Sequence, residues 1–364
     1  MMSAPSILWL FRPTLPSPRA QSIQSMNMAH ALARQGCAVT LIGNRAVEES
    51  LNPYEYYDLE PLPSLSVSLL PGGATAASVL FRARVMSWLL KHPDGIIYAR
   101  SKRYASQIIP WMSKRQKLVL EMHEVDSLLA EERGEPADSI RNLECRVLKS
   151  ASGVVTNAAG TLSVLQAAHS TLPVAMASPN GTHRNRVRTT VSTGVGVGYL
   201  GSLRRYKDLN TLALAAKMTS LPISLVTPEF ETPEANRLRQ VSGHRLRIVP
   251  AVPYSRIPDT LRSFQMVVIP LSDGLFGRSL TSPLKLWDAL AARTPIVGAD
   301  LPSLHEAAPG AFVPYTPGNS SSLVESIERL ATDEALRCSL AETMSPRTWY
   351  ERAGEVVQFL ELLG

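Results

Sequence analysis

The stretch Thr281–Asp300, TSPLKLWDALAARTPIVGAD, places a helix directly before a buried strand. Apolar residues recur at helical spacing from Leu284 to Arg293, and the short apolar run that follows, residues 296–298, is typical of a strand. Ser282 suits the N-cap of this helix, and Pro283 suits its first position. The stretch is one step of an alternating α/β pattern.

The same alternation extends through most of the chain. Predicted strands separated by helices include 6–11, 38–42, 118–122, 153–156, 196–200, 223–226 and 266–270. The polar, basic and turn-rich segment 178–193 interrupts the pattern, and we expect a linker there. Two doubly wound Rossmann-like domains facing across a cleft are therefore predicted, over residues 1–181 and 182–345.

Bulk composition agrees with a soluble α/β protein. The chain has 364 residues, which favours two domains over one, with 45% hydrophobic and 19% charged residues. Its net charge of +6 favours an anionic partner. The first residues lack the basic region and cleavage site of a signal peptide, and no apolar run is long enough to span a bilayer.

Cysteine usage indicates a cytoplasmic protein without a metal centre. The three cysteines, Cys37, Cys145 and Cys338, are far apart in the sequence, and none forms a CxxC pair or a Cys/His spacing typical of zinc. We interpret them as reduced thiols. No metal site and no cofactor are expected.

Lys285 lies in the first turn of its helix, where the helix dipole disfavours a cation. A phosphate at this position would interact favourably with both the lysine and the helix N-terminus. Asp288, three residues later, shares a helix face with Lys285 and would accept hydrogen bonds from sugar hydroxyls. The alternative is a surface ion pair between the two residues, without a ligand.

Two further segments follow predicted strands and therefore lie where ligands bind in open parallel sheets. The basic loop GSLRRYKD, residues 201–208, contains Arg204 and Lys207; a solvated basic loop is the alternative. His123, in EMHEVD, follows the strand 118–122. By contrast, the glycines of GVGYLG, residues 196–201, are interpreted as packing residues and not as a dinucleotide fingerprint, because the next helix begins only near Asp208.

Taken together, the segments GSLRRYK, LSDGLFGRSLTSPLKLWDALA and TPIVGADLPSLHE resemble the C-terminal domain of retaining GT-B glycosyltransferases, the large family of bacterial polysaccharide and glycoconjugate transferases. The resemblance spans nearly the whole chain. Its C-terminal motifs are fairly specific, whereas its N-terminal ones, including the His123 segment and the PNG turn at 179–181, are weak.

The resemblance implies that a UDP- or GDP-sugar binds the second domain and a glycan or lipid-linked acceptor binds the first. It implies a metal-independent retaining transferase, without a nucleic-acid partner, in cell-surface polysaccharide or glycoconjugate biosynthesis. The C-terminal helix, within 346–364, would pack back on the first domain. The site residues implied are His123 for catalysis, Asp288 for the ribose, and a diphosphate group of Arg204, Lys207, Thr281, Ser282 and Lys285.

The chain also departs from the family pattern. The glycine-rich loop near the N-terminus is replaced by Pro13–Gln21, so the cleft loop is expected to use Pro18, Arg19 and Gln21. Ser202 replaces an arginine, and Leu280 replaces the glutamate that binds the donor sugar. Two other functions therefore stay open: a GT-B-like nucleotide-sugar epimerase, with Glu121, Glu124 and Asp126 as acid/base candidates, and a catalytically silent binding or assembly subunit.

One segment of the first domain mixes basic and large apolar residues. Between Val79 and Lys117 there are nine basic residues, interleaved with residues such as Trp88 and Trp111. This mixture is typical of a segment that docks reversibly on an anionic membrane surface. It predicts peripheral association with the inner face of the cytoplasmic membrane; the alternative is an ordinary core with a solvated charged face.

Overall fold

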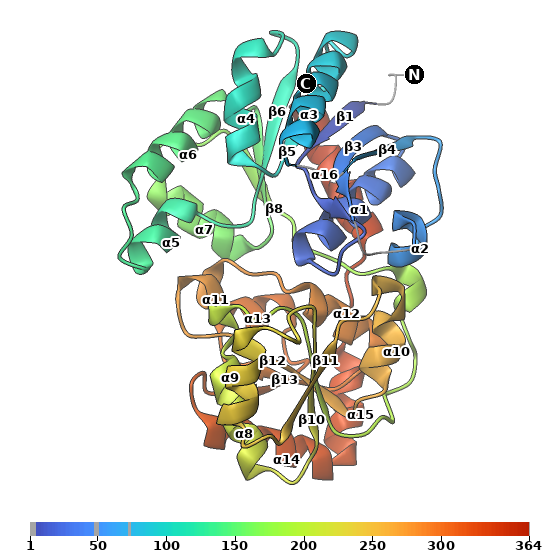
Figure 1. Cartoon of the computed structure of the whole chain (residues 1–364), viewed down its shortest axis with the longest axis vertical. Coiled ribbons are helices and arrows are strands. Elements are labelled where there is room, and N and C mark those ends of the chain that lie inside the picture. Colours follow the sequence, from blue (N-terminus) through green and yellow to red (C-terminus); the bar gives the residue numbers. More distant parts are fainter. Residues whose placement is uncertain (1–4, 47–50, 72–73, 364) are drawn as a thin grey trace. The chain divides into compact units, whose positions relative to one another are not determined.

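The structure is a computed structural model that describes residues 5–46, 51–71 and 74–363. The chain divides into two compact units (Figure 1). The first comprises Met1–Pro179 and Trp349–Gly364, and the second comprises Asn180–Thr348. Each unit contains a parallel β-sheet with helices beside it, so the predicted α/β class is confirmed.

The first unit has an eight-stranded sheet in the order β2-β3-β1-β5-β6-β7-β8, with β4 also paired to β3. Every pairing is parallel. The strands are short and mostly buried, which explains why they read as continuous apolar runs in the sequence. Their bounds are β1 Ser6–Leu10, β2 Thr14–Leu15, β3 Ala38–Arg45, β4 Leu65–Leu70, β5 Ile96–Ala99, β6 Lys117–Met122, β7 Gly153–Thr156 and β8 Val174–Ala177.

Helices of the first unit lie between these strands along the chain, except for the C-terminal helix. They are α1 Ala20–Arg34, α2 Pro53–Tyr57, α3 Ala74–Lys91, α4 Lys102–Ile108, α5 Asp126–Glu132, α6 Asp138–Ser150, α7 Ala159–Ala168 and the C-terminal α16 Trp349–Leu362, with a 3-10 turn η1 at Ile109–Trp111. α16 packs beside α1. Its Phe359 ring lies against Gly153, where an added Cβ would come within 2.8 Å of the ring, so glycine permits the close contact.

The second unit has a six-stranded parallel sheet in the order β11-β10-β9-β12-β13-β14. Its strands are β9 Val197–Leu200, β10 Ile223–Thr227, β11 Leu246–Pro250, β12 Met266–Ile269, β13 Ile296–Ala299 and β14 Val313–Tyr315. Its helices are α8 Leu209–Met218, α9 Pro233–Val241, α10 Ile257–Arg262, α11 Leu275–Ser279, α12 Leu284–Ala292, α13 Pro302–Ala307, α14 Ser320–Thr332 and α15 Glu334–Thr343, with 3-10 turns η2 Arg184–Arg186, η3 Arg205–Lys207 and η4 Tyr254–Arg256.

Both sheets reverse their direction of growth once. In the first unit the chain builds β3 and β4 on one side of β1 and then places β5 on the other side. In the second unit β10 and β11 lie on one side of β9, and β12 lies on the other. At such a switch point the two connecting loops diverge, leaving room for a ligand beyond the carboxyl ends of the strands.

The segment expected to be a linker is packed instead. Thr182 and Arg186 are buried, and Ser192 donates through Oγ to the carbonyls of Arg262 and Phe264 at 2.8 and 2.7 Å. Most of the segment, from Asn180 onward, belongs to the second unit. The polar composition indicated a linker because it does not reveal that Thr182, Arg186 and Ser192 form hydrogen bonds within the second unit, while Arg184 and Asn185 are exposed.

Candidate functional site

In the second unit, the loop after β9 is held in a fixed shape. Gly201 has a φ of +145°, a conformation that favours glycine. The Tyr199 hydroxyl donates to the carbonyl of Ser202 at 2.6 Å, and the backbone N–H of Leu203 donates to Glu229 Oε2 at 3.1 Å. Glu229 thus ties this loop to the segment that follows β10.

This loop contacts the loop that follows β12, on the other side of the switch point. The N–H of Ser272 donates to the carbonyl of Tyr206 at 3.1 Å, and the Tyr206 and Phe276 rings lie 3.9 Å apart between centroids. The Nζ of Lys207 lies 4.9 Å from the Tyr206 ring centroid. The structure therefore places Lys207 where the two connections meet.

Lys285, in the first turn of α12, points its ammonium group to the same place. Its Nζ lies 3.7 Å from the centre of the Tyr199 ring, and a Cβ added to Gly201 would be 3.4 Å from it. The ammonium is buried and has no hydrogen-bond acceptor among the described residues. Burial, reinforced by the nearby charge of Lys207, lowers the pKa of Lys285 well below its usual value. A buried cation without an acceptor is costly, and an anion bound here would offset that cost.

The other residues assigned to the diphosphate group are placed differently. Arg204 is exposed on the loop after β9, whereas Thr281 and Ser282 are buried. The prediction that Ser282 caps α12 is wrong: the N-cap is Pro283, without a side-chain cap. The Ser282 hydroxyl instead accepts from the Asn180 N–H at 3.0 Å and from Trp287 Nε1 at 3.1 Å.

Asp288, expected to bind the ribose, is an internal residue of the second unit. Its Oδ1 accepts hydrogen bonds from Thr182 at 2.7 Å and from the Tyr254 hydroxyl at 2.9 Å, and Arg186 Nη1 lies 3.6 Å away. Burial raises the pKa of Asp288, and Arg186 opposes that shift. With its side chain only 4% exposed, Asp288 joins the buried segment around Thr182 to α12.

Two of the three departures from the family pattern, Leu280 and Ser202, have structural explanations. Leu280 is fully buried in front of α12, where a sugar-binding carboxylate would have no access to water. Ser202 contributes its carbonyl to the hydrogen bond with Tyr199. Its side chain supplies none of the charge of an arginine, so Lys207 and Lys285 are the two cations that the structure brings together here.

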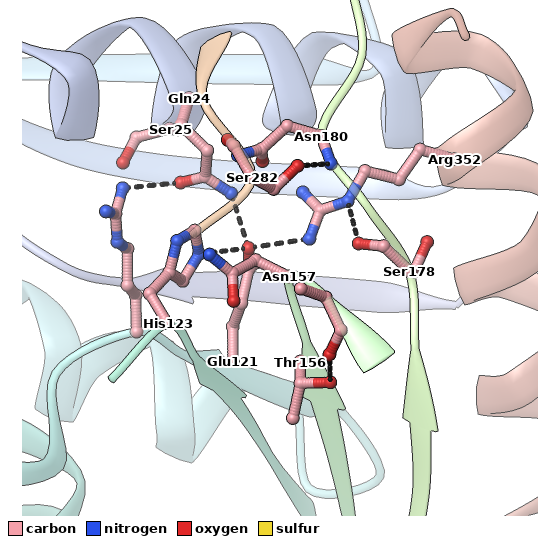
Figure 2. Close-up of polar contacts among 12 residues, drawn as sticks. Gln24, Ser25, Glu121, His123, Thr156, Asn157, Ser178, Asn180, Ser282 and Arg352 are labelled. Atoms are coloured by element: carbon pink, nitrogen blue, oxygen red, sulfur yellow. Dashed lines mark hydrogen bonds and ion pairs between the residues drawn. The ribbon is translucent and has the colours of Figure 1, made fainter. Parts of the chain in front are cut away.

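In the first unit, a buried carboxylate organises the polar residues at the ends of β5 and β6. Figure 2 shows Gln24, His123 and Arg352 pointing at Glu121. Glu121 Oε1 lies 2.6 Å from Gln24 Nε2, 2.7 Å from His123 Nε2 and 2.8 Å from Arg352 Nη2. Burial alone would raise the pKa of Glu121, but Arg352 and His123 outweigh it, and the pKa lies well below its usual range. Glu121 is therefore ionised.

Glu121 fixes the tautomer of His123. Burial, followed by the positive charge of Arg100, lowers the pKa of His123 to about 4, so the ring is neutral near pH 7. An ionised carboxylate can only accept, and the single proton of the imidazole must therefore be on Nε2. The Nδ1 lone pair remains as an acceptor on a side chain that is 15% exposed. His123 is thus arranged to accept a hydrogen bond.

Arg100 joins this group to the N-terminal turn of α1. Its guanidinium donates to Gln24 Oε1 at 2.7 Å and to the carbonyl of Gln21 at 3.1 Å. Burial lowers the pKa of Arg100 to about 10, which leaves it charged near pH 7. Arg19 is the N-cap residue of α1, and both Arg19 and Gln21 are exposed. Pro18 is partly buried in the same loop.

Sequence reasoning missed three members of this group: Gln24, Arg100 and Arg352. Arg100 directly follows β5, so the rule that identified His123 applies to it equally. Gln24 lies on a helix whose apolar residues have the spacing of an ordinary core helix, so nothing in the sequence distinguishes it. Arg352 belongs to α16, more than 200 residues from Glu121, and no local pattern predicts their pairing.

Comparisons with protein-family models and with characterised proteins found no match. Solved structures, however, resemble the chain over nearly its whole length. One is sucrose-phosphate synthase from Thermosynechococcus elongatus, with a TM-score of 0.78, 15% identity and 99% of each chain covered. Another is HepE from Anabaena in complex with UDP and glucose, with a TM-score of 0.74, 15% identity, and 98% of this chain and 99% of that chain covered.

A third similar structure is a putative UDP-N-acetylglucosamine 2-epimerase from Listeria monocytogenes, with a TM-score of 0.62 and 12% identity, covering 98% of this chain and 96% of that chain. Identities this low establish the fold alone. The fold is GT-B, as the sequence predicted. Within the described residues, no helix is long and apolar enough to cross a membrane, and no group of three or more His, Cys, Asp or Glu residues could hold a metal ion.

Proposed function

We propose that the protein is a metal-independent, retaining glycosyltransferase that uses a UDP- or GDP-sugar. The observation that carries this proposal is the buried ammonium of Lys285, which lacks an acceptor and lies at the switch point of the second sheet beside Lys207. A nucleoside diphosphate supplies several anionic oxygens to such a site. The similarity to a structure that contains UDP and glucose supports the same ligand class.

Two lysines at this site suit the chemistry of sugar transfer. When the bond between the anomeric carbon and the diphosphate breaks, negative charge grows on the leaving phosphate oxygens. Fixed cations in a dry site stabilise that charge without reorganisation. We assign this role to Lys285 and Lys207, with Arg204 at the exposed edge of the site. Asp288 is kept as the candidate for the ribose, and its Oδ1 is held by Thr182 and Tyr254.

We further propose that His123 contacts the donor sugar. Its neutral ring presents an unprotonated Nδ1, which accepts a hydrogen bond from a sugar hydroxyl. Glu121, Gln24 and Arg352 are positioning residues, because they act through the ring. No covalent nucleophile is assigned: Oε1 of Glu121, the buried carboxylate nearest to His123, already accepts three hydrogen bonds.

The donor site is tested by calorimetric titration with UDP and with GDP. Lys285→Met and Lys207→Met should each weaken binding by about 1.5–3 kcal/mol, or at least about tenfold, because a charge-assisted hydrogen bond is lost. Lys217→Met is the matched control, since Lys217 is exposed in the last turn of α8. Unchanged affinity in both site variants would refute the proposed diphosphate site.

The reaction is tested by incubating the protein with nucleotide sugars. Release of nucleoside diphosphate together with a glycosylated acceptor, in buffer containing EDTA, would support metal-independent transfer. Proton NMR of the product decides the stereochemistry, because retention gives the same anomeric configuration as in the donor. A glycan or lipid-linked acceptor, and a role in cell-surface glycoconjugate synthesis, are proposed from the sequence resemblance.

An epimerase is the second candidate, because one similar structure is described as a putative epimerase. Epimerisation needs acid and base groups that exchange protons. Of the three acid/base candidates, Glu121 is held ionised by its partners, and Asp126 forms an ion pair with Lys102 at 2.7 Å, which disfavours these two as proton carriers. Burial raises the pKa of Glu124, which leaves Glu124 as the candidate for an epimerase. A new sugar epimer formed without acceptor would favour the epimerase. Nucleotide binding without turnover of any donor would favour a silent binding subunit.

A further inference from the structure

A second cluster of chemically reactive side chains lies in the first unit, apart from the group around Glu121. Cys145 is exposed on α6, and its Sγ lies 3.7 Å from Nδ1 of His169. His169 is the C-cap residue of α7 and is only 8% exposed. A solvent-accessible thiol is thus in contact with a buried imidazole.

A buried carboxylate lies on the far side of this imidazole. Nε2 of His169 is 3.9 Å from Oε2 of Glu144, which is fully buried. Glu144 is itself held in place by Lys102 Nζ at 2.9 Å and by the Asp126 N–H at 2.8 Å. The carboxylate favours the imidazole proton on Nε2, and the Nδ1 lone pair then faces the thiol.

The charge state of His169 suits proton acceptance. Burial lowers the pKa of His169, and the positive charge of Lys102 contributes in the same direction, while Glu144 opposes it. The ring is therefore neutral near pH 7 and able to take a proton from Cys145. The thiol of Cys145, the imidazole of His169 and the carboxylate of Glu144 follow one another in the arrangement that activates nucleophilic cysteines.

We propose that Cys145 is a reactive thiol and a site of reversible modification by small disulfides. In the reaction, His169 Nδ1 takes the thiol proton while Sγ attacks one sulfur of the disulfide. The disulfide S–S bond breaks as the Cys145–S–S–R bond forms, and the leaving thiolate receives the proton from His169. The net products are a mixed disulfide on Cys145 and one small thiol, so no further oxidant is needed.

The other two cysteines provide internal controls. Cys37 is buried, and burial, followed by the charge of Glu361, raises the pKa of its thiol to about 11. It should not react in the folded protein. Cys338 is exposed on α15, and among the described residues its thiol has no recorded hydrogen bond. Cys338 therefore measures the reactivity of an accessible thiol without a base beside it.

The experiment measures modification rates of Cys145 and Cys338 in the same native full-length chain. Oxidised glutathione and iodoacetamide are added in excess in separate reactions at about pH 7. Mass spectrometry of peptides quantifies the modified fraction of each cysteine over time. General-base assistance typically contributes 10²–10⁴-fold, so Cys145 should react at least about tenfold faster than Cys338. In His169→Gln, the Cys145 rate should fall toward that of Cys338, whose own rate should not change.

Two results would overturn the proposal: equal rates at Cys145 and Cys338 in the wild-type protein, or an unchanged Cys145 rate in a folded His169→Gln variant. The wild-type ratio stands without any variant, so a folding defect in His169→Gln leaves the test decisive. Cys145→Ser should abolish the fast modification and retain the slow one, which confirms the assignment of the fast site.

Discussion

Lys285 combines three features that are each unfavourable in the free protein. Its ammonium is buried without an acceptor, it lies in the first turn of a helix, and Lys207 is close enough to repel it. Each cost is reduced by the same event, the binding of an anion. That combination is stronger support for a diphosphate site than the sequence motif, because a surface lysine in the same motif would carry only the cost of its helix position.

The lowered pKa of Lys285 predicts that binding of a nucleoside diphosphate takes up protons. The diphosphate raises the pKa of Lys285 back toward its usual value. The affinity for the diphosphate should therefore fall as the pH rises above the pKa that Lys285 has in the ligand-free protein. Calorimetry over a series of pH values at which the ligand is already ionised, in two buffers of different ionisation enthalpy, measures the uptake directly. Lys285→Met should show none. Equal uptake in wild type and variant would place the proton elsewhere.

His123 gives a second pH-dependent prediction, for stability. In the unfolded chain its ring takes up a proton near pH 6.5, whereas in the folded protein it does so only near pH 4. Between these values the unfolded state binds more protons, so the free energy of unfolding should decrease as the pH falls from 6.5 to about 4. Urea unfolding at several pH values should show a smaller decrease for His123→Asn. Parallel curves for the two proteins would contradict the neutral ring.

For single residues, the sequence predicted their place in the fold better than their side-chain contacts. Lys207 and His123 follow predicted strands, and residues that follow parallel strands lie at the carboxyl edge of the sheet, where ligands bind. The packing of Asp288 was not predicted, because its spacing from Lys285 gives a shared helix face but does not reveal what packs on that face. Thr182 and Tyr254, its partners, are 106 and 34 residues away in the sequence. Arg352 was missed for the same reason.

Among the secondary-structure elements, α16 couples the end of the chain to the proposed catalytic group. Arg352 donates through Nε to the carbonyl of Ser178 at 3.0 Å and through Nη2 to Glu121 at 2.8 Å. Burial would lower the pKa of Arg352, but Glu121 and Tyr98 raise it, so the guanidinium stays charged. The helix is therefore both a packing element and the source of the main counter-charge for Glu121.

Replacing Arg352 by Met should destabilise the first unit by about 3–5 kcal/mol, because it leaves the carboxylate of Glu121 buried without that counter-charge. Gln358→Met is the matched control, since Gln358 is exposed on the same helix. Chemical denaturation measures both changes. Removing all residues after Glu351 should have a larger effect, loss of soluble protein, because Phe359 and its apolar neighbours are then lost from the core. Wild-type stability of Arg352→Met would rule out this role.

The long elements were predictable, and the short ones were not. The helix predicted from Leu284 to Arg293 is α12, Leu284–Ala292, because its helical periodicity is clear and turn residues follow it. The two-residue β2 and the five-residue α2 and α11 are too short to show a period. The segment 178–193 shows the converse error: its polar composition indicated a linker, although five of its polar residues, Ser178, Asn180, Thr182, Arg186 and Ser192, are buried.

For the molecule as a whole, membrane docking is a proposal. The structure reduces the set of apolar residues that could contact a membrane. Among the apolar residues of the basic segment, Phe81, Val85, Trp88, Leu89 and Ile108 are buried in the core. Leu90 and Trp111 are 80% and 66% exposed. Exposed basic residues that accompany them are Arg82, Arg84, Lys91, Arg103, Lys114 and Arg115. The α3 and α4 helices that carry most of these residues are neighbours, since Phe81 packs against Tyr104 with ring centroids 4.9 Å apart.

These exposed residues predict reversible binding to anionic vesicles. Each basic residue near an anionic leaflet contributes about 1 kcal/mol, and exposed Trp and Leu side chains enter the boundary between headgroups and acyl chains. Sedimentation with vesicles containing phosphatidylserine should pellet the protein at low salt and release it at high salt. The double variant Leu90→Ser, Trp111→Ser should bind more weakly. Met218→Ser, at an exposed apolar position of the second unit, should bind like the wild type. Equal pelleting with neutral and anionic vesicles, or equal loss in both variants, would reject docking through this surface.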